Sequence, residues 1–304
     1  MKEAENTVFE GHLYLDHYAP PTLWNIVRGG FDSVDNLPLD DQDFALSVAM
    51  SSMIANGGNS ARRLESELQI EIVRQLTSPQ SVSRLTGMFV FDDLESLAQI
   101  WDANDWGGHF KQEYLTDVGV SARRLSRHDA NWVARMIAKD GSLLAGWKQA
   151  AVSYWNGKPS TDTAPVWERI VSGTFCIWSM QSKLTALKEI KAVWPQSLNL
   201  LTVCMNFFAV GSQDGQVFPG ITKTEDSLSL GYYLRMKDVN NSMVLDRILQ
   251  LSKVDSEIYT PPLNSDTLML PDLTGFQVHL PLTDQEQLTR LSTLFAVVKS
   301  GRST

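Results

Sequence analysis

The stretch LYLDHYAPPTLWNIVRGGF (13–31) predicts a strand, a sharp reversal and a short helix within nineteen residues. Its first part, LYLDHY, alternates between apolar and polar residues in the way that is typical of a half-buried strand. The pair Pro20–Pro21 ends the strand and suits the first turn of a helix, where a backbone N–H is not needed. The pair Gly29–Gly30 then ends the helix. The chain therefore turns back on itself close to its start.

Beyond this stretch, strands and helices alternate without a fixed order, which predicts an α+β fold. We expect further strands in GMFVFDD (87–93), EYLTDVGVSA (113–122) and WERIVSGTFCIW (167–178), and helices over 60–76 and 93–104. The pattern changes near residue 181. From there we expect a helix over 185–194, an apolar run over 198–211, a strand over 228–236 and a closing helix over 286–298. We therefore predict two parts, residues 1–180 and a smaller α/β region over 181–304.

The composition indicates a folded protein without a metal site or a membrane span. The chain has 304 residues, of which 43% are hydrophobic, and this is enough for one large core or two smaller ones. Apolar runs are too short to span a membrane and the first residues are acidic and polar, so we expect a cytoplasmic protein. Two cysteines, Cys176 and Cys204, make neither a disulfide framework nor a zinc site, and the five histidines lack the spacing of metal ligands.

The net charge of −9 is distributed unevenly along the chain. Residues 1–60 contain nine acidic and two basic residues, so most of the negative charge lies there. Residues 118–139 form the opposite case, with five basic residues and only Asp129 against them: Arg123, Arg124, Arg127, Arg135 and Lys139. Such a cluster can contact nucleic acid, and it can equally be the solvated face of a helix.

The common catalytic signatures are absent from the sequence. It contains no GxxxxGK[ST] phosphate loop, no GxGxxG, no GxSxG and no HExxH motif. The triplet RHD at 127–129 shares only letters with the kinase HRD motif. These enzyme classes are therefore not predicted.

The opening stretch resembles the first strand and helix of DarT-like ADP-ribosyltransferases. In that family a strand reading roughly YHxT is followed by NLxxILxxGGL; here the two pieces read YLDH and PTLWNIVRGGF, with similar spacing. Two later segments resemble the same fold in the same order, SRLTGMFVFDDLESLAQIWDAN (83–104) and AVSYWNGKPSTDTAPVWERIVSG (151–173). The resemblance covers roughly residues 8–178 and implies a split β-sheet core with flanking helices that binds NAD.

The resemblance also implies roles for individual residues. Glu168 would be the catalytic glutamate, and a carboxylate within the apolar strand WERIVSG needs a partner or a function; a salt bridge to an arginine is the structural alternative. The residues that would contact NAD are Tyr14, Leu15, His17, Arg62, Arg84 and Phe89. Arg62 or Arg84 would hold the pyrophosphate, and Arg123, Arg124 and Arg127 would hold the acceptor.

One position departs from the family pattern. The strand histidine of the family aligns with Leu15, whereas this chain has His17 two residues later, on the same face of a strand. Either His17 makes the contact to the NAD ribose, or the site is altered and binds NAD poorly.

The function implied by the resemblance is transfer of ADP-ribose from NAD to a macromolecule, with nucleic acid (DNA or RNA) favoured over protein as the acceptor. The setting would be a toxin of a prokaryotic toxin–antitoxin or anti-phage system, with a neutralising antitoxin as a possible partner. The alternative is a binding protein that keeps the fold but not the chemistry, such as an immunity module whose acidic first sixty residues face a basic partner.

Overall fold

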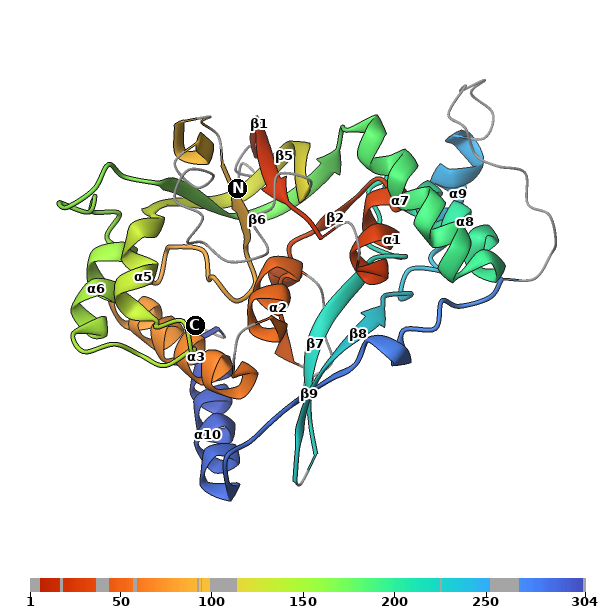
Figure 1. Cartoon of the computed structure of the whole chain (residues 1–304). Coiled ribbons are helices and arrows are strands. Elements are labelled where there is room, and N and C mark those ends of the chain that lie inside the picture. Colours follow the sequence, from red (N-terminus) through yellow and green to blue (C-terminus); the bar gives the residue numbers. More distant parts are fainter. Residues whose placement is uncertain are drawn as a thin grey trace.

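The structure is a computed structural model of the whole chain, and two antiparallel β-sheets form its frame (Figure 1). It describes residues 6–16, 19–36, 44–56, 59–91, 93, 95–98, 114–224, 226–251 and 268–302. Helices and antiparallel strands both contribute to it, and the expected α+β class is confirmed.

The first sheet is organised around two long strands, β5 and β6. Its strand order is β1 (Thr7–Tyr14), β5 (Leu115–Asp129), β6 (Trp167–Ile177) and β2 (Gly30–Asp32), and β4 (Met88–Val90) also pairs with β6. Just beyond β4, Phe91 exchanges two backbone hydrogen bonds of 2.9 and 3.1 Å with His12 of β1. The strands β1, β5, β6 and β4 therefore form a closed ring of pairings.

The second sheet joins distant parts of the sequence. Its order is β3 (Phe44–Ala45), β7 (Val217–Lys223), β8 (Leu228–Leu234) and β9 (Val278–Leu280). The short strand β3 is supplied by the first fifty residues, and it pairs with β7 at Phe44–Ile221 and Ala45–Gly220. Both sides of the predicted boundary at residue 180 therefore build this sheet.

Helices cover the first sheet in two groups, each with its own hydrophobic core (Figure 1). The first core is built by α2 (Val48–Ala55), α3 (Ser60–Thr77), α6 (Trp147–Trp155) and α10 (Gln285–Arg302). The second is built by α1 (Pro20–Arg28), α7 (Met180–Val193) and α8 (Leu198–Ala209). Consecutive residues of β6 separate the two cores, because Ile170 packs into the first and Val171 into the second.

The helix predicted within 13–31 is present as α1, and its ends follow the sequence signals. Pro20 and Pro21 occupy its first turn, and Gly29 ends it with a left-handed φ of 115°. The chain then enters β2 at Gly30, where a Cβ atom would lie 1.9 Å from the carbonyl oxygen of Phe175. A side chain at Gly30 is therefore incompatible with the pairing of β2 and β6.

Polar side chains of α1 bind the backbone of residues 212–217, which lie beyond the predicted boundary. The Trp24 indole N–H donates to the Gly215 carbonyl at 2.8 Å. The Arg28 guanidinium donates to the carbonyls of Ser212 and Asp214 at 2.7 and 3.1 Å. Residues 181–304 are therefore attached to the opening stretch by buried hydrogen bonds.

The remaining elements concern the basic segment at 118–139 and the helices not yet described. Strand β5 includes residues 118–129 of the basic segment, so Arg123, Arg124 and Arg127 lie on a strand and not on a helix. Two further helices are α5 (Val133–Met136) and α9 (Ser242–Leu251). Within the described residues, none of the helices is both long and apolar enough to cross a membrane.

Candidate functional site

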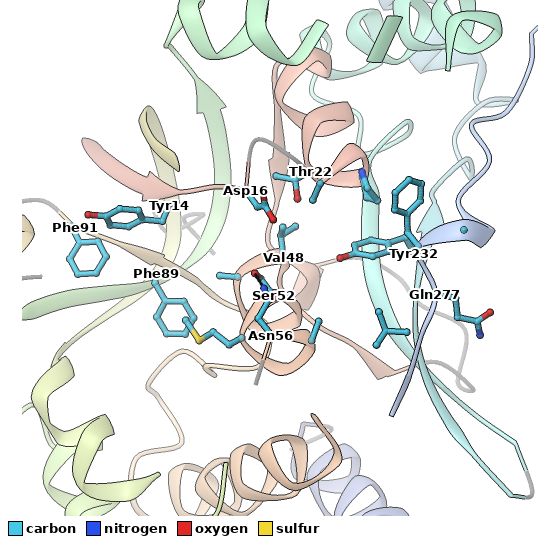
Figure 2. Close-up of a pocket in the computed structure, with 18 residues that line it drawn as sticks. Tyr14, Asp16, Thr22, Val48, Ser52, Asn56, Phe89, Phe91, Tyr232 and Gln277 are labelled. Carbon is cyan, nitrogen blue, oxygen red and sulfur yellow. Dashed lines mark hydrogen bonds between the residues drawn. The ribbon is translucent and has the colours of Figure 1, made fainter. Parts of the chain in front are cut away.

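A cavity of about 340 Å³ lies where the opening stretch meets both sheets (Figure 2). Its lining comes from the end of β1, the start of α1, one side of α2, the end of β4, and β8 with the segment before β9. The lining residues that carry the following argument are Tyr14, Asp16, Ser52, Phe89, Phe91 and Tyr232. A volume of this size is at the lower end of the range for small-molecule sites.

Aromatic rings form one end of the cavity. Phe89 and Phe91 are two residues apart along the chain, so both project from the same face, and Figure 2 shows them beside Tyr14. The rings of Tyr14 and Phe91 meet edge to face, with centroids 6.0 Å apart. The backbone bridge between Phe91 and β1 holds this aromatic group in place.

Polar side chains line the middle and the other end. Helix α2 begins at Ser47, whose side chain accepts a hydrogen bond from the Met50 N–H, and it directs Ser52 and Asn56 toward the cavity (Figure 2). The Asn56 amide donates to the Ser52 hydroxyl at 3.1 Å. Tyr232 of β8 enters from the opposite side.

Asp16 is the only aspartate, glutamate, lysine, arginine or histidine among the described residues that line the cavity. It follows β1 directly and lies above Val48 and Ser52 in Figure 2. Burial raises the pKa of the Tyr232 hydroxyl, and the Asp16 carboxylate raises this pKa as well, although a hydrogen bond with Ser51 opposes the rise. The two side chains are therefore electrostatic neighbours.

A buried ionic network lies next to the aromatic end. Arg84 is 3% exposed, and its guanidinium donates to Glu67 of α3 at 3.2 Å, to the Tyr154 hydroxyl at 2.9 Å and to Glu168 at 3.4 Å. The Tyr154 hydroxyl in turn donates to Glu168 at 2.7 Å. The Arg84 guanidinium also lies 4.9 Å from the centroid of the Phe89 ring. Phe89 therefore touches both the network and the cavity.

The two carboxyl groups of the network respond differently to their surroundings. Burial raises the pKa of Glu168, because Arg84 and Tyr154 compensate only part of the lost solvation. Burial also opposes ionisation of Glu67, but the ion pairs with Arg84 and Arg63 outweigh it and lower the pKa of Glu67. Glu67 is thus the principal counter-ion of Arg84.

The structure brings some of the expected NAD-contacting residues together and separates others. Tyr14 and Phe89 both line the cavity, whereas Leu15 is 1% exposed and packs into the second core. His17 lies outside the described residues. Arg62 is on the surface and pairs with Asp140 at 2.8 Å, away from the cavity lining.

The expected catalytic and phosphate-binding residues, Glu168 and Arg84, lie side by side in the network. Neither is among the described residues that line the cavity. The salt bridge that the sequence left open as the alternative for Glu168 is present in this geometry.

The three expected acceptor-binding arginines are near one another on β5, but each has a partner. Arg123 approaches Asp32 at 3.9 Å and Arg124 binds Asp35 at 3.0 Å. Arg127 stacks on Trp167, with 4.1 Å between the guanidinium and the ring centroid. The first two are therefore partly neutralised.

Sequence reasoning missed several lining residues, notably Asp16, Ser52, Asn56 and Tyr232. Asp16 lies inside the quoted stretch, and its position just after an aromatic strand end is a signal that could have identified it. Among the described residues, no cluster of histidine, cysteine and acidic side chains is arranged to hold a metal ion. Comparison of the chain with models of known protein families and with curated proteins finds no match.

Proposed function

We propose that this protein is an ADP-ribosyltransferase and that its cavity receives the nicotinamide–ribose end of NAD. The observation that carries the proposal is the combination of an aromatic end, formed by Tyr14, Phe89 and Phe91, with the single carboxylate of Asp16. The nicotinamide ring of NAD is a planar cation, and aromatic faces and carboxylates are the groups that attract such a ring.

The size and charge of the cavity fit this half of the dinucleotide. A volume of about 340 Å³ accommodates a nicotinamide ring with its ribose, while the rest of NAD must extend beyond it. No lysine or arginine is found among the described lining residues, so the cavity itself offers no cationic side chain to the pyrophosphate. Arg84 does not supply this contact either, because its donors are directed to Glu67, Tyr154 and Glu168.

The chemistry is cleavage of the bond between the nicotinamide nitrogen and ribose C1′. The bonding electrons leave with the nitrogen, which becomes neutral, and positive charge develops on the ribose. An acceptor nucleophile then attacks C1′ and loses its proton. A fixed carboxylate stabilises that positive charge more than it stabilises bound NAD, and this difference accelerates the reaction.

For the acceptor we propose nucleic acid, as the resemblance to DarT-like enzymes implies. On β5 and β6, Arg127 stacked on Trp167 is the pairing best suited to a base or a phosphate, because a guanidinium lying on an aromatic ring can hold both kinds of group. The biological setting would be a toxin held in check by a protein partner.

A second candidate is a binding protein that retains the cavity without the transfer reaction. Two observations favour it: Leu15, in place of the family histidine, is buried in the core, and Glu168 is tied to Arg84 and Tyr154. Binding of NAD without cleavage would identify this function.

The experiment begins with purified protein and NAD in a calorimeter, followed by labelled NAD with a cell lysate. If the protein transfers ADP-ribose, label should appear on a macromolecule. Loss of that label on digestion with nuclease or with protease then identifies the acceptor as nucleic acid or protein. Ser52→Phe should fill the cavity and abolish NAD binding, whereas the control Gln181→Phe, on the exposed side of α7, should not. Normal NAD affinity in Ser52→Phe would place the binding site elsewhere.

A further inference from the structure

Asp16 occupies the place in the cavity where a carboxylate can act on a bound ribose. Figure 2 shows it between the aromatic end, with Tyr14 and Phe89, and the side on which Tyr232 enters. A ring seated against the aromatic end would therefore direct its attached sugar toward Asp16.

The backbone around Asp16 is fixed on both sides. The Leu15 N–H donates to the Tyr114 carbonyl at 2.8 Å, which extends the pairing of β1 with β5 by one residue. The Asp16 carbonyl accepts the N–H of Ala19 at 3.3 Å, immediately before α1 begins. Asp16 is thus held between a strand end and a helix start, as a positioned group must be.

Glu168, in contrast, is not among the described residues that line the cavity. Its side chain is 6% exposed, and its Oε1 atom accepts hydrogen bonds from Tyr154 and Arg84. Phe89, which packs against Arg84 of this network, lines the cavity in its place. A carboxyl group placed in this way stabilises the network and does not face a ligand.

We infer that Asp16 is the catalytic carboxylate of the proposed reaction and that Glu168 is a structural residue. This inference rests on the proposed function, since it assigns the charge-stabilising role in NAD cleavage. As the bond from C1′ to nitrogen breaks, the Asp16 carboxylate faces the positive charge on the ribose while nicotinamide leaves as a neutral molecule. No proton moves to or from Asp16 in this step.

The first test uses two probes of nearly equal shape, nicotinamide and 1-methylnicotinamide, of which only the second is a cation. Wild-type protein should bind the cation about tenfold more tightly, because an opposite charge within a few ångströms in a partly buried site contributes that much. Asp16→Asn should remove the preference while keeping affinity for the neutral probe. Equal wild-type affinities for the two probes would overturn the role of Asp16 without involving catalysis.

The second test compares NAD cleavage in Asp16→Asn and Glu168→Gln. Asp16→Asn should lower kcat by about 10²-fold or more with an unchanged melting temperature, as loss of a charge-stabilising group does. Glu168→Gln should lower the melting temperature while the folded protein keeps its turnover within a few fold. The reverse pattern would overturn the inference and restore Glu168 as the catalytic residue.

The proposed function and the role of Asp16 fail in different ways. Wild-type protein that neither binds nor cleaves NAD would overturn the proposed function and the catalytic role together. Cleavage by wild type that persists in Asp16→Asn would overturn only the role of Asp16. If Glu168→Gln does not fold, the binding and turnover of Asp16→Asn still decide whether Asp16 is the catalytic carboxylate.

Discussion

Glu67 and Glu168 share one arginine and burial raises the pKa of both, yet only the ion pairs of Glu67 outweigh burial and lower its pKa. Glu67 accepts two hydrogen bonds from Arg84, at 3.2 and 3.4 Å, and one from Arg63 at 2.7 Å. Glu168 receives one long contact from Arg84 and depends on the Tyr154 hydroxyl for its short hydrogen bond. At the residue scale, Tyr154 is therefore the group whose loss should expose the weakness of the network.

Tyr154→Phe should lower the free energy of unfolding by about 1–3 kcal/mol, because it leaves a buried carboxyl without its short hydrogen bond. Urea unfolding measures this change. The matched control is Tyr233→Phe, which removes a hydroxyl that bonds the half-buried Thr222 on the second sheet and should cost about 0.5–1.5 kcal/mol. An equal loss in the two variants would contradict a special role for Tyr154.

His128 should make stability depend on pH. Its Nδ1–H donates to the Tyr154 carbonyl at 2.7 Å and its Nε2 accepts from the Ser126 hydroxyl at 2.8 Å, so the neutral ring is fully bonded. Burial lowers the pKa of His128 to about 4, from 6.5. Between these values the unfolded chain binds the extra proton, so this contribution is present above pH 6.5 and is lost as the pH falls toward 4.

The expected contribution of His128 is about 3 kcal/mol at neutral pH, by linkage. Glu168, whose pKa is raised by burial, gives a slope of opposite sign, so the comparison must be between variants. Denaturant unfolding at pH 7, 5.5 and 4.5 should show that His128→Gln loses part of the wild-type decrease, whereas the exposed control His279→Asn keeps it. If the free energy of unfolding falls equally with decreasing pH in wild type and His128→Gln, the assignment of this pH dependence to His128 is refuted.

At the scale of elements, the exit from α1 is the most sensitive point of the quoted stretch. Gly30→Ala should prevent normal folding or lower the melting temperature strongly, because the new Cβ would overlap the Phe175 carbonyl. Gly29→Ala should cost at least about 1–2 kcal/mol, since alanine is strained at a φ of 115° and its Cβ would lie 2.8 Å from the Phe208 ring. Gly275→Ala is the control, because no atom of the described residues outside its immediate neighbours lies within 4 Å of the place its Cβ would take. Thermal unfolding compares the three, and a near-neutral Gly30→Ala would contradict the close approach.

Local signals make some elements predictable. Helix α1 carries its own start and stop residues, α3 begins at the capping residue Asn59, and the strand around Phe89 has an apolar run that can be recognised directly. The sequence pattern predicts strand β5 only to residue 122, because RRLSRHD has no apolar alternation and forms a strand through its pairing with β6. Residue propensities alone do not predict a strand that forms through its pairing with a neighbouring strand.

The same distinction applies to the candidate site. Tyr14 and Phe89 are predictable because they belong to strands with clear patterns. Tyr232 lies more than two hundred residues from Tyr14, and only the pairing of β8 with β7, which packs against α1 and α2, brings it to the cavity. Likewise, the partnership of Glu168 with Arg84 and Tyr154 depends on three separate elements meeting in one core.

At the scale of the whole molecule, neither core belongs to one half of the sequence. The first core includes side chains from the second sheet and α10, among them Leu228, Leu230, Leu288, Leu291 and Phe295. The second includes side chains from α7, α8 and the turn between them, among them Ile190, Trp194, Leu200, Leu201 and Cys204. Residues 181–304 therefore complete the two hydrophobic cores that residues 1–180 begin.

A chain shortened to residues 1–180 should fail to fold cooperatively. Each buried aliphatic side chain contributes about 1.5–3 kcal/mol, so the loss of five such side chains already matches the whole stability of about 5–15 kcal/mol of a domain. The fragment would also expose Trp24 and Arg28, whose buried hydrogen bonds end on the backbone of residues 212–215. Circular dichroism during heating should show no sharp transition for the fragment and a clear one for the full chain.

A chain ending at residue 284, which lacks only α10 and the residues after it, should show a transition of intermediate sharpness, because it loses side chains of the first core alone. A cooperative transition in the 1–180 fragment, with NAD affinity equal to that of the full chain, would show that the halves are independent and that the shared cores are dispensable.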